Sequence, residues 1–337
     1  MRSQSWRQAV AAALGFVLAG TNAQTGSLTD LGTLLSGQKN LTTFYSLIQK
    51  YPQILLQLPS YQGVTILAPS NDAFNKIPYT ELNQAFANND QDVITNVLEY
   101  HILQGSRTAA QLVPGTPEFI PTLLTNKAYS NVSGGQRVQN VKQAGNVVVF
   151  VSGQGSRSTL TQADLAFNGG VVQVIDSLLI PPSNLTLTMN TFNITAMEGA
   201  LFQADKFDEF SNMANVTIFA PQNDAFQDLG PAIANLTVEE LASVMDYHLV
   251  PQVVYSTGLT NGTKFLTQQG ENITILHDGN NLYINSAQLL TADILCANGV
   301  IHMIDNVLNP QGPGAQPNPD IGQQGPVFAS ASELSTL

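Results

Sequence analysis

The chain of 337 residues is long enough for two domains of ordinary size. Hydrophobic residues make up 43% of it and charged residues 11%, a composition that excludes wholesale disorder. The formal net charge is −12, and most of it falls on residues 183–310, where it disfavours nucleic acid and anionic membrane surfaces as partners.

The first residues have the pattern of a secretory signal peptide. Arg2 and Arg7 form a basic segment, Ala9 to Leu18 form a short apolar run, and Thr21-Asn22-Ala23 offers a cleavage site. The apolar run is too short to span a bilayer of ~30 Å as a helix, so no membrane span is expected. We predict a signal peptide over residues 1–23 and secretion of the chain that follows.

Two further features suit a secreted protein. Cys296 is the only cysteine, so no intrachain disulfide can form, and we expect its thiol to be buried and inert. Eight Asn-x-Ser/Thr sequons are candidates for N-glycosylation. They are Asn40, Asn131, Asn184, Asn193, Asn215, Asn235, Asn261 and Asn272.

Three sequence blocks occur twice, in the same order, which indicates two copies of one domain. The block pairs are VTILAPSNDAF (64–74) with VTIFAPQNDAF (216–226), VLEYHIL (97–103) with VMDYHLV (244–250), and GGVVQVIDSLLIPP (169–182) with NGVIHMIDNVLNP (298–310). We therefore predict domain 1 over residues 27–182 and domain 2 over residues 183–310.

Within each copy, helices are predicted first and strands afterwards. Apolar residues at helical spacing predict helices over 42–58 and 195–213, and the VTI(L/F)AP blocks predict buried strands that end at proline. Thr237 to Glu240 has the pattern of a capping box opening the helix that leads to Tyr247. Strands are predicted over 272–277, 282–286 and 299–304, so the order of elements favours an α+β domain.

Residues 311–337 are rich in Pro, Gly and Gln and are predicted to form a disordered tail. The tail ends Ser335-Thr336-Leu337 without a hydrophobic stretch. A GPI-anchor signal requires such a stretch, so no GPI anchor is expected.

The three blocks resemble those of the fasciclin-like domains, the repeats of fasciclin I, periostin and plant arabinogalactan proteins. Tyr100-His101 and Tyr247-His248 match the family's Tyr-His motif, and the resemblance covers about residues 27–310. It implies that each repeat is a β-wedge or sandwich with helices packed on one side. It also implies a role in cell adhesion or matrix binding.

The resemblance also implies candidate recognition residues. In some animal members, recognition is assigned to the Tyr-His region and to an Asp-Ile pair before the last block. In this sequence the candidates are Tyr100, His101, Tyr247, His248, Asp293 and Ile294. Copy one departs from the pattern, because it has Asp164-Leu165 at the place of the Asp-Ile pair.

A structural role competes with recognition at several of these positions. A part-buried tyrosine and histidine with hydrogen-bond partners would fix the helix against the sheet. Ser70 or Asn71, and Asn223 or Asp224, stand where a helix N-cap is expected. At Asp72 and Asp224, helix capping is predicted in preference to metal binding. Asp176 and Asp305 are predicted to bond to turn backbone.

No catalytic, metal or cofactor motif is recognisable in the sequence. Ser70, His101 and Asp72 could be arranged as a triad, but copy two has Gln222 in place of Ser70. We predict no catalysis and no cofactor. The leading hypothesis is adhesion to a cell-surface or matrix or wall protein or polysaccharide. The alternatives are a carbohydrate or lipid binder with a pocket between wedge and helices, and a hydrolase with an unfamiliar site.

Charge separates the two copies. Residues 27–182 hold 8 basic and 9 acidic residues, whereas residues 183–310 hold 2 basic and 13 acidic residues. Six of the eight sequons lie in or beside the acidic copy. We therefore expect copy one to offer more protein surface for contacts.

Overall fold

The structure is a computed structural model that describes residues 28–60 and 63–328. The predicted signal peptide lies outside the described residues. Contacts divide the chain into two compact units: unit 1 extends to Asn126 and includes Gly134–Pro181, and unit 2 includes Lys127–Ser133 and continues from Pro182. Among the described residues, no helix is long and apolar enough to cross a membrane.

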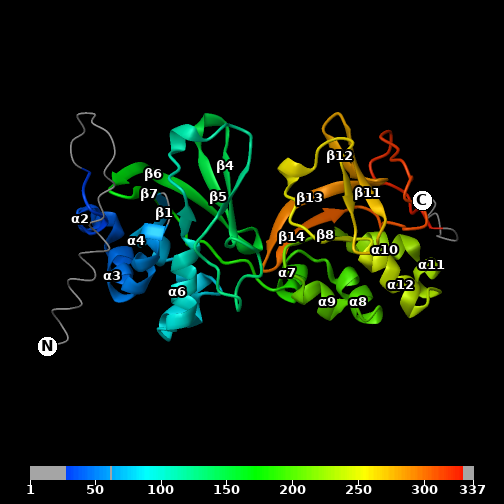
Figure 1. Cartoon of the computed structure of the whole chain (residues 1–337), viewed down its shortest axis with the longest axis horizontal. Coiled ribbons are helices and arrows are strands. Elements are labelled where there is room, and N and C mark those ends of the chain that lie inside the picture. Colours follow the sequence, from blue (N-terminus) through cyan, green and yellow to red (C-terminus); the bar gives the residue numbers. More distant parts are fainter. Residues whose placement is uncertain (1–27, 61–62, 329–337) are drawn as a thin grey trace. The chain divides into compact units, whose positions relative to one another are not determined.

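The helices of unit 1 precede most of its strands. They are α2 (Leu31–Ser36), α3 (Thr42–Lys50), α4 (Asn71–Phe74), α5 (Asn83–Ala87) and α6 (Gln91–Tyr100), with 3-10 turns that include η2 (Pro52–Ser60), η3 (Ile77–Tyr79) and η4 (Ala109–Gln111). These helices gather on one side of the sheet (Figure 1). The arrangement agrees with the α+β domain that the order of predicted elements favoured.

The strands of unit 1 form one seven-stranded sheet in the order β2-β1-β7-β6-β5-β4-β3. They are β1 (Val64–Pro69), β2 (Ile102–Gln104), β3 (Glu118–Pro121), β4 (Arg137–Lys142), β5 (Val148–Val151), β6 (Arg157–Phe167) and β7 (Gly170–Ile175). The parallel pair β1–β7 joins the first and last repeated blocks of the sequence. An antiparallel bridge from Leu103 to Thr122 links the two ends of the strand order, so the sheet nearly closes into a wedge.

Unit 2 repeats this architecture. Its helices are α7 (Leu185–Thr191), α8 (Thr195–Gln203), α9 (Phe207–Asn212), α10 (Asn223–Leu229), α11 (Pro231–Ala234) and α12 (Val238–Asp246), with the 3-10 turn η7 (Ser256–Gly258). Its strands are β8 (Val216–Pro221), β9 (Leu249–Val250), β10 (Lys264–Leu266), β11 (Asn272–Asp278), β12 (Asn281–Ile284), β13 (Ala287–Cys296) and β14 (Gly299–Ile304). The order β10-β11-β12-β13-β14-β8-β9 is the order of unit 1 written from the other end.

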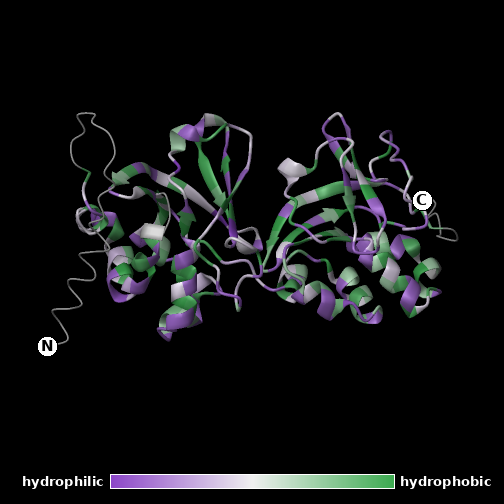
Figure 2. Ribbon diagram, viewed as in Figure 1, coloured by the Kyte–Doolittle hydropathy of each residue, from purple (hydrophilic) through white to green (hydrophobic). Residues whose placement is uncertain are grey.

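The central strands bury both faces. All six residues of β1 and all six of β8 are buried, as the apolar VTI(L/F)AP blocks predicted. Alternate residues face the helices, including Val64 and Ile66 in unit 1, whereas Thr65 and Leu67 face the wedge. Figure 2 shows hydrophobic residues concentrated in the strands, whereas hydrophilic and hydrophobic residues alternate along the helices.

Two predicted helices are each broken in the structure. The helix predicted over 42–58 ends at Lys50, because Pro52 lacks the N–H that an α-helix would need and starts the 3-10 segment η2. The helix predicted over 195–213 is divided into α8 and α9 at Asp205, whose φ of 55° is left-handed. The capping box at Thr237 and Glu240 is confirmed at the start of α12.

Residues 311–328 form no helix or strand, yet they pack against unit 2. The backbone N–H of Gln324 donates a 2.8 Å hydrogen bond to Asp305 Oδ2, and Asn309 Nδ2 donates a 2.9 Å bond to Val327 O. Phe328 packs against the helix-side core. Of the tail predicted over 311–337, residues 311–328 therefore contact unit 2, and residues 329–337 lie outside the described part of the chain.

Lys127–Ser133 is the exception to the expected domain boundary. It falls within the predicted domain 1, but its contacts place it in unit 2. Asn131 N–H donates a 2.7 Å hydrogen bond to Ala297 O, and Ser133 N–H donates a 2.7 Å bond to Asn215 Oδ1. A boundary inferred from sequence blocks cannot detect such a loop, because its partners lie about 80 residues or more away in sequence.

Candidate functional site

The two Tyr-His motifs are buried in the same way in both units. His101 Nδ1 lies 2.7 Å from Val97 O, and the N–H of Leu179 donates a 2.9 Å hydrogen bond to its Nε2. In unit 2, His248 makes the equivalent bonds, at 2.8 Å to Val244 O and 2.9 Å from Leu308 N–H. Each imidazole therefore joins the helix before it to the segment that follows the last strand of its unit.

This geometry fixes the state of both rings. A carbonyl oxygen can only accept, so Nδ1 of each ring carries the proton and Nε2 accepts. Burial lowers the pKa of His101 and of His248 from 6.5 to about 4, and the hydrogen bond to the helix carbonyl opposes this only in part. Both histidines are thus neutral at pH 7, with both ring nitrogens occupied.

The tyrosines beside them are also internal. Tyr100 and Tyr247 have no exposed surface, and their hydroxyls donate to Arg137 O at 2.8 Å and to Asn272 O at 3.0 Å. The candidate recognition residues of the Tyr-His motif therefore lie inside the fold. Their geometry favours the structural role that the sequence left open, namely fixing α6 and α12 against the sheets.

The triad considered for Ser70, His101 and Asp72 is not assembled. The ring nitrogens of His101 contact backbone groups, and Ser70 Oγ accepts a hydrogen bond from the N–H of Ala73. Within the described parts of the chain, no three His, Cys, Asp or Glu side chains are grouped as a metal site requires.

The NDA segments begin α4 and α10, and Ser70 is the one of the two expected residues that caps α4. The N-cap of α4 is Ser70, and that of α10 is Gln222, which makes no side-chain capping bond. Asp72 and Asp224 are exposed residues in the first turn and do not cap.

The asparagines of the same segments have another role. Asn71 Oδ1 accepts a 3.0 Å bond from Thr43 N–H, and Asn223 Oδ1 accepts a 2.9 Å bond from Ala196 N–H. They cap the preceding helices α3 and α8, which are distant in sequence, so local spacing could not indicate this role.

The Asp-Ile pair of unit 2 is buried. Asp293 is 8% exposed and Ile294 is 3% exposed. Asp293 lies at an irregularity of β13 with a φ of 62°, and its Oδ1 accepts a 2.7 Å hydrogen bond from Ser256 N–H. Asp164 has the same role in unit 1, with a φ of 60° and a 2.9 Å bond from Ala109 N–H. Both aspartates hold the loop that follows the second strand of their unit.

Nine residues after each of these aspartates, a buried side chain bonds to the aspartate N–H and to the same loop. It is Gln173 in unit 1 and His302 in unit 2. In unit 1, Gln173 Oε1 accepts from Asp164 N–H at 2.9 Å, and Gln173 Nε2 donates to Arg107 O at 3.1 Å. In unit 2, His302 Nδ1 accepts from Asp293 N–H at 3.3 Å, and its Nε2 donates to Val254 O at 2.8 Å. Burial lowers the pKa of His302, and the nearby carboxylate of Asp293 opposes the shift.

We expect His302→Gln to be tolerated, because a glutamine already makes the equivalent bonds in unit 1. Loss of the ring contact with Phe219, whose centroid lies 5.5 Å away, should cost about 1 kcal/mol. His302→Leu should cost about 2–4 kcal/mol, because two buried backbone groups lose their partners. Urea unfolding at pH 7 measures both variants, and equal losses for Gln and Leu would contradict the equivalence.

Asp176 and Asp305 accept hydrogen bonds from the backbone of a neighbouring strand, whereas bonds to turn backbone were expected. Asp176 Oδ1 accepts from Thr159 N–H at 2.7 Å, and Asp305 Oδ1 accepts from Gln288 N–H at 2.7 Å. Burial raises the pKa of Asp305, and its hydrogen bonds to backbone N–H groups oppose the shift. Both residues fix the start of the long strand beside β7 or β14.

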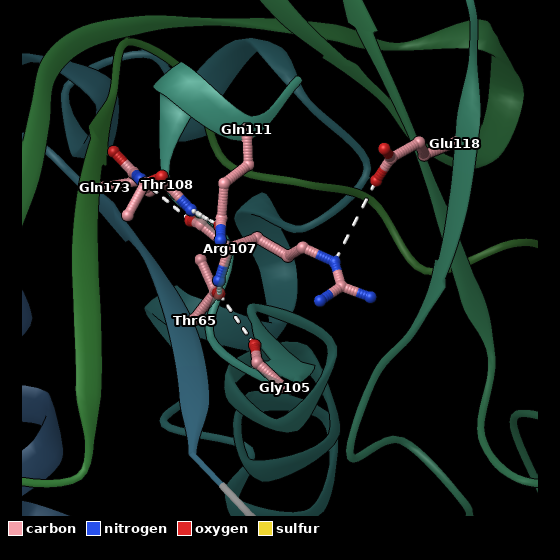
Figure 3. Close-up of polar contacts among 7 residues, drawn as sticks. All are labelled: Thr65, Gly105, Arg107, Thr108, Gln111, Glu118 and Gln173. Carbon is pink, nitrogen blue, oxygen red and sulfur yellow. Dashed lines mark hydrogen bonds and ion pairs between the residues drawn. The ribbon is translucent and has the colours of Figure 1, made fainter. Parts of the chain in front are cut away.

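Hydrogen bonds and one ion pair hold the loop after β2, and Figure 3 shows these contacts. Thr65 Oγ1 accepts a 2.8 Å bond from Arg107 N–H and donates a 2.8 Å bond to Gly105 O. The guanidinium of Arg107 extends toward Glu118, with Nε 3.9 Å from the carboxylate. Thr108 and Gln111 form a capping box that holds η4 in place.

One buried polar atom beside this loop has no partner. Asn140, on β4, is 3% exposed, and its Oδ1 makes no hydrogen bond. An unsatisfied buried acceptor costs about 1–3 kcal/mol. No sequence motif marks Asn140, but one signal is present: Asn140 shares a strand face with buried Val138, where an apolar residue is expected.

Comparisons with known proteins agree with the repeated architecture. The Fasciclin domain family model matches residues 39–181 and 192–310. The chain belongs to the fasciclin domain family. The resemblance inferred from the three sequence blocks is therefore confirmed, as is the fold of two tandem domains, each a β-wedge with helices.

Individual relatives extend the comparison. A "Fasciclin-like arabinogalactan protein" of Arthroderma benhamiae is 31% identical over 304 residues, which cover 90% of this chain and 72% of the relative. Human periostin is 25% identical over 255 residues, 73% of this chain and 28% of periostin. The solved FAS1 domain pair from the insect cell adhesion molecule Fasciclin I aligns with a TM-score of 0.38 and 20% identity, covering 81% of this chain and 98% of the pair. The chain is thus similar to proteins of the fasciclin type from fungi and animals.

Proposed function

We propose that this fasciclin-domain protein is a secreted, glycosylated and non-catalytic binding protein that acts in adhesion to a cell surface, matrix or cell wall. The partner is a protein or polysaccharide of that surface. The names of its relatives, which include a fungal fasciclin-like arabinogalactan protein and periostin, support the adhesion class.

The observation that carries this proposal is the internal use of the repeated polar residues. The Tyr-His pairs and the bulge aspartates are engaged with backbone groups inside each unit. General base catalysis needs an imidazole with a free nitrogen near a nucleophile, and His101 and His248 offer none. The repeated residues maintain the wedge, so recognition falls to its outer surface.

The distribution of charge and sequons supports unit 1 as the contact surface. Six sequon asparagines have exposed side chains: Asn40, Asn184, Asn193, Asn235, Asn261 and Asn272. Of these, only Asn40 belongs to unit 1. Glycans on the others would cover much of the acidic unit 2, and a partner would meet more protein surface on unit 1.

We expect Asn131 and Asn215 to remain without glycan in the secreted protein. Both are half-buried, Asn131 Nδ2 donates to Asn212 O at 2.8 Å, and Asn215 Nδ2 donates to Ser133 Oγ at 2.9 Å. A glycan on either nitrogen would displace the loop Lys127–Ser133. Glycopeptide mass spectrometry measures occupancy at each sequon, and substantial occupancy at either asparagine would contradict this expectation.

Adhesion itself is tested with the whole secreted chain on beads. Beads coated with the glycosylated protein are offered the producing cells and their purified wall polysaccharides, and saturable attachment is the expected result. Absence of attachment to any cell or polysaccharide would contradict the adhesion proposal.

Two matched surface variants locate the contact. Tyr79 is 90% exposed on unit 1, and Phe202 is 60% exposed on unit 2. Exposed aromatic side chains often contribute strongly when an interface buries them. We expect Tyr79→Ser to reduce attachment several-fold and Phe202→Ser to leave it unchanged. If only Phe202→Ser reduces attachment, the contact does not lie on unit 1. If unit 2 still fails to bind after its glycans are removed, glycan shielding does not explain why partners bind unit 1.

A further inference from the structure

A hollow of about 330 Å³ opens on unit 1 between η4 and strands β4 to β6. Its walls include Ala109, Val148 and Leu160, and these three residues also line a smaller cavity behind it. The smaller cavity has a volume of about 10 Å³, enough for roughly one water molecule or one hydroxyl group. The hollow is large enough for a small organic ligand.

The inner cavity lacks one hydrogen-bond donor. Asn140 lines it, and its Oδ1 is the buried atom without a partner. A hydroxyl group both donates and accepts, so it satisfies the amide of Asn140 in either orientation of that side chain. Apolar ligand groups cannot do this.

The charged side chains that line the two cavities are both cationic. Arg107 lines the inner cavity, and its Nε lies 3.9 Å from Glu118. Lys142 lines the hollow and donates a 3.4 Å bond to Ala109 O, and within the described parts of the chain it has no carboxylate within 4.0 Å. The nearby carboxylate of Asp164 accepts from Ala109 N–H and Gln173 Nε2. Lys142 is therefore available to an anion.

The distance between the two anchoring positions sets the length of the ligand. Asn140 and Lys142 stand two residues apart on β4, so they share a face of the strand and lie ~7 Å apart along it. The wall between them is apolar, since Val148 and Leu160 stand on the neighbouring strands β5 and β6.

We propose that unit 1 binds a small amphipathic hydroxy acid, with its hydroxyl at Asn140, its apolar body against Val148 and Leu160, and its acid group at Lys142. This site is separate from the adhesive surface proposed above. It also differs in place from the pocket considered between wedge and helices, because η4 and the outer strands of the wedge form it.

Unit 2 carries larger side chains at a strand pair that lies beside the inner cavity in unit 1. Phe219 and His302 are partners in the β8–β14 pair and stack at 5.5 Å, whereas the matching pair in unit 1 is Leu67 and Gln173. The smaller side chains of unit 1 leave space in the wedge beside Gln173, which lines the inner cavity.

The test uses the full glycosylated chain and isothermal titration calorimetry. The probe is 4-hydroxycinnamate, compared with cinnamate, which lacks the hydroxyl, and 4-hydroxycinnamyl alcohol, which lacks the acid group. We expect saturable binding of 4-hydroxycinnamate and at least tenfold weaker binding of the other two. A fourth probe, 6-hydroxyhexanoate, distinguishes a flexible aliphatic body from an aromatic one.

Two variants assign the contacts. Lys142→Gln should lower the affinity for 4-hydroxycinnamate about tenfold and leave the affinity for 4-hydroxycinnamyl alcohol unchanged. The matched control is Lys264→Gln, which alters an exposed lysine of unit 2. Asn140→Leu should keep the fold, as checked by circular dichroism, and abolish the advantage of the hydroxyl. Equal affinity for the three aromatic probes, no binding by any of the four probes, or a folded Asn140→Leu variant that retains the advantage would overturn the proposal.

Discussion

Acidification from pH 7 to pH 4 is expected to destabilise each unit by about 3 kcal/mol through its buried Tyr-His histidine. His101 and His248 have a folded-state pKa of about 4, whereas an unfolded histidine has a pKa of 6.5. Their contribution to stability is therefore complete above pH 6.5 and is lost as the pH falls toward 4, because the unfolded chain binds the proton first. A difference of 2.5 pKa units corresponds to about 3 kcal/mol at pH 4.

Other buried groups modify this slope. Burial lowers the pKa of His302 in unit 2, which adds to the acid sensitivity of that unit. Burial raises the pKa of Glu99 and Asp305, and these carboxyl groups act in the opposite direction because the folded chain binds their protons more readily. The total change in unfolding free energy on acidification is therefore obtained by measurement, and substitution of the histidines gives their share of it.

The variants His101→Gln and His248→Gln isolate that part. A glutamine amide can donate to the helix carbonyl and accept from the backbone N–H, so the bonds are retained while the titration is removed. Urea unfolding followed by circular dichroism at pH 7 and pH 4 gives the free energy of unfolding at each pH. We expect each substitution to lower stability modestly at pH 7 and to reduce the acid loss of its own unit.

The decisive comparison is between the unaltered chain and the double variant His101→Gln and His248→Gln. If the double variant at His101 and His248 loses as much stability between pH 7 and pH 4 as the unaltered chain, the buried histidines do not cause the acid sensitivity.

Alanine at Gly170 or Gly299 is expected to cost at least about 3 kcal/mol or to prevent folding of the unit concerned. These glycines begin β7 and β14 and stand opposite Val64 and Val216 in the parallel pairs. An added Cβ would lie 2.0 Å from Val64 O at Gly170 and 1.9 Å from Val216 O at Gly299. The backbone oxygen cannot move away without breaking the central ladder of the sheet.

Gly199 provides the control for this experiment. It lies exposed in α8, an added Cβ would meet no atom within 4 Å, and Gly199→Ala should therefore stabilise unit 2 by about 0.5–1 kcal/mol. Urea unfolding and limited proteolysis show which unit each substitution affects. A Gly299→Ala chain within about 1 kcal/mol of the unaltered protein would show that the close approach is not required.

Much of the fold is determined by local sequence pattern. The VTI(L/F)AP strands, the capping box at Thr237 and the final strand at Gly299 depend on residues close together in the chain, so periodicity and capping chemistry indicate them directly. The repetition of three blocks established two copies, and the resemblance of those blocks supplied the family. The breaks at Pro52 and Asp205 were missed, because an apolar pattern continues across both.

The candidate sites were decided by tertiary structure. The sequence named the Tyr-His and Asp-Ile residues but could not tell exposed recognition from internal hydrogen bonding, since their partners include Leu179 and Leu308, at least 60 residues away. The hollow of unit 1 forms only where η4 packs beside strands β4 to β6 in the folded chain. Asn140 is recognised as a candidate only because its buried Oδ1 has no hydrogen-bond partner. Local pattern indicates which residues form strands and helices, because apolar periodicity and capping residues depend on neighbours in the chain. Burial of a polar group depends on contacts distant in sequence, and only the folded chain brings those together.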